Sequence, residues 1–230
     1  MAPRFALYTA PPAEHPLHRF AAQWLGWDPE TGMALPPQPA AGLGAARIAA
    51  LTAEPRQYGF HGTLKPPFFL AEGCDEAQLI VALERFVQTR KPLRLPLKMA
   101  ALGSFLALRP AAAMPALDQL AADCVCDFDR FRAPSSEQEL ARRRAAGLSE
   151  RQEQYLRDWG YPYVLEEFRL HFTLTGRIAD EAERAAVLAY LTEQTAPFTQ
   201  REFELNELCL FVQGEPGAPF RIAGRYRFGG

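Results

Sequence analysis

The sequence has no long hydrophobic run. None of its apolar stretches reaches the roughly 18 residues that a membrane-spanning helix needs. The apolar stretch at the N-terminus is short and is followed by Pro11-Pro12, which predicts a strand over 4–9 rather than a signal peptide. We therefore expect a cytoplasmic protein that makes no membrane contact.

Cysteine is also scarce, with four residues among 230. Cys124 and Cys126 are separated by one residue where zinc sites usually have two, and a disulfide framework is unusual at this length. We expect ordinary reduced cysteines, with neither a metal nor a cofactor. His15 and His18 lie in a proline-bounded segment without a cysteine or carboxylate at metal-ligand spacing, and we interpret them as surface residues.

The chain has no excess of positive charge. Its formal charge is −2, with 48% hydrophobic and 23% charged residues, a composition typical of an ordinary globular protein. Binding to long nucleic acid needs a dense cationic surface, so this partner is not expected. A small phosphorylated ligand or the end of a short oligonucleotide stays compatible with the composition.

One pattern stands out because histidine is rare. Two of the four histidines begin the pattern His-x-Thr-Leu, at His61 with Thr63 and at His171 with Thr173. Alternate side chains of a strand point to opposite faces, so each copy, taken as a strand, has an apolar row on one face. The imidazole and the hydroxyl then lie side by side on the other face.

Three nearby residues are candidate substrate contacts. Lys65 and Arg169 each lie two positions from a motif histidine or threonine, although both could instead cap exposed strand ends. Tyr8 would share the polar face of the strand over 4–9 with Arg4.

The sequence after each copy of the motif has the same order of predicted secondary-structure elements. Each motif is followed by a helical pattern that opens with acidic residues, as the helix dipole favours, and then by strand-like text. This repetition predicts two similar lobes. The first motif lobe covers about 52–110 and the second about 163–228. The two helices are expected to start near Asp75 and Asp180, and the strands that follow them at 93–108 and 203–212.

The remaining text predicts further helices at 16–27, 45–51 and 115–126, and a polar helical insert at about 127–160 without a counterpart elsewhere. Within the insert, the run Arg142-Arg143-Arg144 has two interpretations. It can be a solvated helix face paired with nearby glutamates, or a flap that brings an arginine over a phosphate. Arg132 is a second flap candidate.

The paired motifs suit phosphodiester chemistry. In-line attack at phosphorus needs a base for the nucleophile and an acid for the leaving oxygen, and imidazole serves both roles near neutral pH. Threonine hydroxyls can donate hydrogen bonds to the non-bridging oxygens. We therefore expect His61 and His171 to be catalytic, with the assignment of acid and base open, and Thr63 and Thr173 to bind phosphate.

These features resemble the 2H phosphoesterase superfamily of 2′,3′-cyclic phosphodiesterases and RNA ligase-like proteins, and within it the branch associated with bacterial phosphonate-utilisation operons. The resemblance implies an α+β, bilobal fold over 1–230 as a single domain, with two pseudo-symmetric lobes, an antiparallel sheet and outer helices in each, and the active-site cleft between them. It rests on the doubled motif and on the segments Tyr58-Gly59-Phe60-His61-Gly62-Thr63-Leu64-Lys65-Pro66-Pro67-Phe68 and Trp159-Gly160-Tyr161-Pro162-Tyr163.

The leading functional hypothesis is a metal-independent phosphodiesterase that hydrolyses a cyclic or short phosphodiester of a small sugar or nucleotide, in phosphonate metabolism as the resemblance implies. Two alternatives stay open. One is a non-catalytic module that binds a phosphorylated metabolite, and the other is a phosphodiesterase that processes RNA ends.

Overall fold

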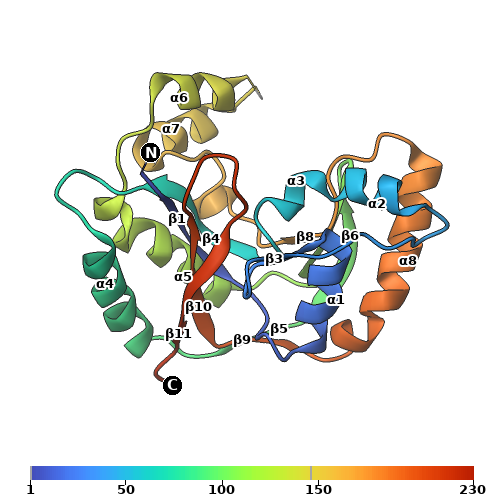
Figure 1. The fold of residues 1–230 in the computed structure, drawn as a ribbon. Coiled ribbons are helices and arrows are strands. Elements are labelled where there is room, and N and C mark those ends of the chain that lie inside the picture. The colour runs from blue at the N-terminus through green and yellow to red at the C-terminus, as the bar shows by residue number, and fades with distance from the viewer. Residues whose placement is uncertain (1, 146) are drawn as a thin grey trace.

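The computed structural model describes residues 2–145 and 147–230, and it has an α+β fold built around one antiparallel sheet (Figure 1). The sheet has seven strands in the order β11-β10-β1-β4-β8-β7-β6. Its strands are β1 (Arg4–Thr9), β4 (Gly62–Phe69), β6 (Leu97–Leu102), β7 (Phe105–Pro110), β8 (Phe172–Thr173), β10 (Glu207–Gln213) and β11 (Arg221–Arg227). Two short ladders pair β2 (Trp27–Asp28) with β3 (Met33–Ala34), and β5 (Leu93–Leu95) with β9 (Phe203–Leu205).

Five helices, α1, α2, α4, α5 and α8, begin within a residue of where the sequence predicts them, and local caps explain two of these starts. Asp75 forms a capping box with Gln78, and the Asp180 side chain accepts a hydrogen bond from the backbone N–H of Glu183. The helices are α1 (Pro16–Leu25), α2 (Ala45–Leu51), α3 (Ala53–Arg56), α4 (Glu76–Gln88), α5 (Pro115–Asp127), α6 (Glu137–Arg144), α7 (Glu150–Trp159) and α8 (Glu181–Thr199), with single 3₁₀ turns at Asp129–Phe131 and Leu165–Glu167.

The bilobal α+β fold expected from the sequence is confirmed, and the sheet shows how the lobes are joined. One half contains β4 with β1, β10 and β11, and the other contains β8 with β7 and β6. After each motif strand the chain forms a helix and then crosses to a hairpin in the opposite half, with β5 and β9 pairing where the crossings meet. Each half therefore draws strands from both 52–110 and 163–228.

The seam between the halves is narrow. Strands β4 and β8 pair through Gly62 and Phe172, the central residues of the two His-x-Thr motifs. Gly62 has to be small here, because a Cβ atom would lie 2.8 Å from Leu170 Cδ1 and 3.1 Å from Phe172 Cζ. One core cluster nevertheless contains residues of both halves, so the two halves share a single apolar interior.

Among the described residues, no helix is both long and apolar enough to cross a membrane. The same part of the chain contains no group of three or more histidine, cysteine or acidic residues that could hold a metal ion. The four cysteines are unpaired, and Cys124 and Cys209 are buried.

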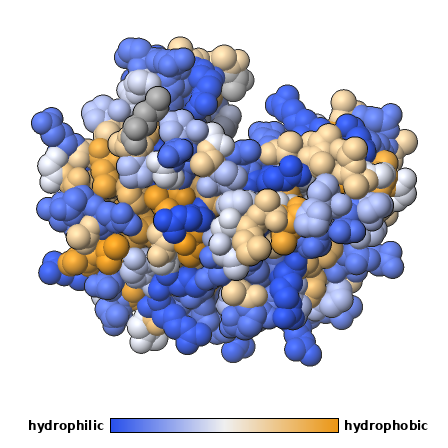
Figure 2. All heavy atoms as spheres, in the orientation of Figure 1, coloured by the Kyte–Doolittle hydropathy of each residue, from blue (hydrophilic) through white to orange (hydrophobic). Residues whose placement is uncertain are grey.

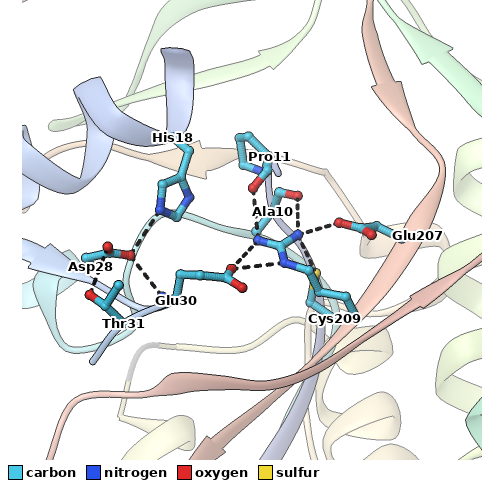
Figure 3. Close-up of polar contacts among 9 residues, drawn as sticks. Ala10, Pro11, His18, Asp28, Glu30, Thr31, Glu207 and Cys209 are labelled. Carbon is cyan, nitrogen blue, oxygen red and sulfur yellow. Dashed lines mark hydrogen bonds and ion pairs between the residues drawn. The ribbon is translucent and has the colours of Figure 1, made fainter. Parts of the chain in front are cut away.

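The surface assignment of His18 was wrong. The residue is 3% exposed, and its Nε2 lies 3.0 Å from Asp28 Oδ1 (Figure 3). The left-handed turn at Gly26 brings Asp28 back beside α1, an approach that the sequence spacing does not reveal. His15 instead caps α1 by accepting a hydrogen bond from the backbone N–H of Leu17.

A second polar group in the same view ties the edge of the sheet to the N-terminal region (Figure 3). The Arg225 guanidinium on β11 pairs with Glu30 beyond β2 and with Glu207 on β10. It also donates to the backbone carbonyls of Ala10 and Pro11, just after β1. These contacts fix the end of β1 that carries Tyr8.

Candidate active site

The pairing of β4 and β8 brings the two motifs together. Because the pairing is antiparallel and centred on Gly62 and Phe172, it places His61 opposite Thr173 and Thr63 opposite His171. Gly62 and Phe172 are buried, so the four polar side chains lie on the opposite face of the sheet. Residues far apart in the chain thus form one compact set of two imidazoles and two hydroxyls.

The His61 ring is held at both nitrogens. Its Nδ1 donates a hydrogen bond to the Gly59 carbonyl at 2.9 Å, and its Nε2 lies 3.2 Å from the Thr63 hydroxyl. A carbonyl can only accept, so this network assigns the proton to Nδ1 and leaves Nε2 as the acceptor. The Tyr8 ring stacks on the imidazole with 3.9 Å between ring centroids, which fixes the plane of the ring.

His171 is held in the same way. Its Nδ1 lies 2.8 Å from the carbonyl oxygen of Arg169, again two residues earlier in the chain. Both histidines therefore have Nδ1 bound to the backbone, and both have Nε2 as the nitrogen available for chemistry. Phe105, at the start of β7, packs near the ring with 5.7 Å between centroids.

The surroundings of His61 favour its neutral form. Burial of the ring lowers the pKa of His61 to about 4, against the opposing effect of the hydrogen bond to Gly59. The positive charge of a protonated His171 also lowers this pKa. At neutral pH His61 is consequently a neutral imidazole, with its proton on Nδ1 and the acceptor lone pair at Nε2.

The four motif side chains line a cleft of about 660 Å³. Helices α6 and α7 project above one half of the sheet and α2 and α3 above the other, and the molecular surface is notched between these projections (Figures 1 and 2). The cleft lining includes Arg4, Tyr8, Glu54, Tyr58, His61, Thr63, Ser104, Phe105, Arg142, Arg143, Tyr161, His171, Thr173, Thr175 and Arg177.

A family model matches residues 63–221 of the chain, described as "Protein of unknown function (DUF1045)". The chain belongs to the DUF1045 family. The match runs from the threonine of the first motif through the whole second motif, so it contains most of the cleft.

This DUF1045 chain also has curated relatives. It is 36% identical over 231 aligned residues to a protein of Janthinobacterium sp. (strain Marseille) named "Ribose 1,5-bisphosphate phosphokinase PhnN", covering 99% of the chain and 51% of the relative. A protein of the same name from Laribacter hongkongensis (strain HLHK9) is 36% identical over 222 residues, covering 95% and 50%. The chain therefore spans about half the length of these relatives.

Two solved structures are similar to the chain at low sequence identity and low TM-score. One is described as "Crystal structure of phosphoesterase", with 15% identity and a TM-score of 0.44. The other is "Crystal structure of E.coli LigT complexed with 3'-AMP", with 14% identity and a TM-score of 0.42. Each comparison covers 99% of both chains.

Of the four residues named as possible substrate contacts in this DUF1045 chain, Tyr8 lines the cleft, and Lys65, Arg169 and Arg132 are not among its lining residues. Lys65 lies on the opposite face, where its ammonium donates to the Val125 carbonyl at 3.0 Å and lies 3.6 Å from Asp129. The register between β1 and β4 shifts between Thr63 and Lys65. This irregularity breaks the alternation that predicted Lys65 beside the motif.

Arg169 and Arg132 also lie outside the cleft lining. The Arg169 guanidinium folds back to the Glu166 carbonyl at 2.8 Å, because the 3₁₀ turn before it offers a nearby acceptor. Arg132 pairs with Asp129 at 2.7 Å and donates to the Asp158 carbonyl, which ties the start of the insert to its end. Both residues are therefore structural cations rather than cleft residues.

Sequence reasoning did not nominate several residues that the structure places in the cleft. Arg177 continues the alternating polar row of His171, Thr173 and Thr175, which was a readable signal. Tyr161 precedes the second motif by ten residues, and only the folding of the insert brings it there. Arg142 and Arg143 of the arginine run line the cleft, and their contact with a phosphate stays a prediction.

Proposed function

We propose that this DUF1045 chain is a two-histidine phosphodiesterase of the 2H type, which opens a cyclic phosphate or cleaves a short phosphodiester on a small sugar or nucleotide. The observation that carries the proposal is the register of β4 and β8, which sets two His-x-Thr pairs head to tail in one cleft. Each imidazole is fixed by its Nδ1 hydrogen bond, so that both Nε2 atoms serve the same ligand.

The geometry supports a division of roles. His61, neutral because its pKa is lowered to about 4, takes a proton from the attacking water at Nε2. The water oxygen bonds to phosphorus as the bond to the leaving oxygen breaks, and protonated His171 gives its Nε2 proton to that oxygen. The hydroxyls of Thr63 and Thr173 donate hydrogen bonds to the non-bridging oxygens. Exchange of protons with solvent restores both rings.

The names of the curated relatives fit a phosphorylated ribose as substrate. They are named for a kinase, but this chain contains no G-x-x-x-x-G-K-[ST] segment, the phosphate-binding loop of P-loop kinases, and it matches only half of each relative. We assign the named kinase reaction to the other half. The half represented by this chain then acts on a phosphodiester of a related sugar, without a metal ion.

The test is turnover of a panel of ribose and nucleoside cyclic phosphates by the wild-type protein and by His61→Ala and His171→Ala. Each substitution should lower kcat/KM by about 10²- to 10⁴-fold while circular dichroism stays unchanged. Activity should survive EDTA. Near-normal turnover in both variants, or loss of activity on chelation, would contradict the mechanism.

Two rival functions make different predictions in the same assay. A sensor of phosphorylated metabolites would bind a cyclic nucleotide in calorimetry without releasing product. An enzyme that processes RNA ends would prefer short oligonucleotides bearing a 2′,3′-cyclic phosphate over mononucleotides. The two anchored imidazoles favour hydrolysis over sensing, since binding alone does not need two aligned titratable groups.

A further inference from the structure

One wall of the cleft collects arginine and tyrosine side chains that the two-histidine mechanism does not use. Arg4 comes from the first residue of β1, Arg142 and Arg143 come from α6, and Tyr58 and Tyr161 come from the loops before the two motifs. They belong to the same cleft as His61 and His171, and α6, which carries two of the arginines, lies in the projection above that half of the sheet (Figure 1).

Arg143 is held in place and has unused hydrogen-bonding capacity. Its side chain is only 15% exposed, its guanidinium lies 4.6 Å from the centroid of the Tyr161 ring, and one amino group donates to Glu139 at 2.8 Å. Its Nε–H is buried and has no hydrogen-bond partner among the described residues. A guanidinium that lines a cleft and has more N–H donors than its partners use is suited to binding an anion.

The positive charge of this wall exceeds the negative charge around it. Glu139 is the carboxylate that pairs with both Arg143 and Arg142, the latter at 3.8 Å, and it does not line the cleft. Arg4 donates to the neutral amide of Gln213 and lies near two phenylalanine rings. Three guanidinium groups therefore line this wall. Glu139 pairs with two of them, and Glu215 lines a neighbouring pocket with Arg4 and Arg142. Glu54 and Arg177 line the cleft elsewhere.

The tyrosines add hydroxyl donors to the same region. Burial raises the pKa of Tyr161, so its hydroxyl keeps its proton at neutral pH. Tyr58 stacks on Phe220 with 5.5 Å between centroids, and its ring centroid lies 6.0 Å from that of His61. The cationic wall is thus continuous with the histidine that activates water.

From this arrangement we infer that Arg143, Arg142 and Arg4 form a second anion subsite, which binds a phosphate monoester on the substrate away from the phosphodiester that the histidines cleave. The inference rests on the proposed function and narrows its substrate to a cyclic phosphodiester of a sugar that carries another phosphate. A planar guanidinium matches the oxygens of a phosphate monoester, and a dianion gains most from a cluster of cations.

The test compares two substrates that differ in one group, adenosine 2′,3′-cyclic phosphate and the same compound with a 5′-phosphate. For the wild-type protein, kcat/KM for the 5′-phosphorylated compound should exceed that for the parent by about 10-fold or more. The same comparison of Kd, measured by calorimetry with the His171→Ala variant, should favour the 5′-phosphorylated ligand by a similar factor.

Matched variants of one helix locate the effect. Arg143→Gln should reduce the preference for the 5′-phosphorylated compound about 10-fold. Arg142→Gln should also reduce it, and because the Arg142 side chain is 71% exposed, this substitution should not disturb folding. Arg144→Gln is the control, because Arg144 lies on the same helix, pairs with Glu153 and does not line the cleft. The control should keep the wild-type preference.

The outcomes separate the two proposals. Equal kcat/KM for both compounds in the wild type, or an unchanged preference in Arg142→Gln and Arg143→Gln, would overturn the second subsite while leaving the phosphodiesterase intact. If the wild type hydrolyses neither compound, the proposed reaction fails. The Kd ratio of the wild-type protein then decides the subsite alone, and a ratio near one would refute it.

Discussion

At the scale of single residues, each catalytic candidate is oriented by a backbone carbonyl two positions earlier. His61 uses Gly59 and His171 uses Arg169, so the same local turn of the chain sets the same tautomer twice. The doubled sequence motif encodes the ring and the hydroxyl of each pair. The carbonyl that orients each ring is a backbone group, so the residue types of the motif do not predict this contact.

The lowered pKa of His61 predicts a pH dependence of stability. The ring binds a proton near pH 6.5 in the unfolded chain but only near pH 4 in the folded protein, so its contribution is fully present above pH 6.5 and is lost as pH falls towards 4. Urea unfolding at pH 7 and pH 4.5 should show a loss about 1–3 kcal/mol larger in the wild type than in His61→Gln. Equal losses would show that burial does not hold the ring neutral.

Two nearby residues of β4 provide a matched test of the face that each side chain occupies. Thr63→Val removes a hydroxyl that would contact a non-bridging oxygen, and kcat/KM should fall about 10- to 100-fold. Lys65→Met changes a buried side chain whose ammonium donates to Val125 on the other side of the sheet. It should lower the free energy of unfolding, while kcat/KM of the folded variant stays within about threefold of wild type. A large loss in Lys65→Met would place that cation back in the cleft.

At the scale of helices and strands, the sequence predicted where elements occur better than it predicted which strands pair with one another. Caps such as Asp75 and Asp180, together with apolar periodicity, located the helices within a few residues. The pairing of β4 with β8 and the shift of register before Lys65 depend on contacts between distant segments, and neither leaves a local pattern. The sequence pattern around Lys65 correctly predicted a strand, but it placed the Lys65 side chain on the wrong face of the sheet.

Gly62 tests the importance of the pairing between the motif strands. An alanine methyl would lie 2.8 Å from Leu170 and 3.1 Å from Thr9, so Gly62→Ala should force the strands apart. We expect a loss of about 1–3 kcal/mol in the free energy of unfolding and at least a 10-fold fall in kcat/KM. Gly214→Ala, where a Cβ would meet nothing within 4 Å, is the control and should leave both unchanged. Equal behaviour of the two variants would contradict the tight seam.

At the scale of the whole molecule, the two halves of the sheet exchange hairpins and share one core. The cluster contains Leu83 of α4 from one side and Val187 of α8 from the other, and the Trp24 indole donates a hydrogen bond to the Leu174 carbonyl at 2.7 Å. The repeated order of parts in the sequence indicated two lobes. It could not show that each half contains strands from both repeats, because separate lobes and lobes with exchanged hairpins fit the same apolar pattern.

The shared core predicts that the protein unfolds as one unit. Denaturation followed by far-ultraviolet circular dichroism and by tryptophan fluorescence should give coincident transitions, with Trp24 and Trp159 reporting from α1 and from the end of α7. Two resolved transitions would mean that the halves fold independently despite the exchanged hairpins.

The residue pair at the middle of the sheet has a stereochemical consequence. Because Gly62 and Phe172 are the midpoints of both motifs, the floor beneath a bound phosphorus atom looks almost the same after half a turn. Such a floor cannot by itself distinguish the entering oxygen from the departing one. Handedness must come from the walls, where Arg143 and Tyr161 line one part of the cleft and Glu54 and Arg177 line another.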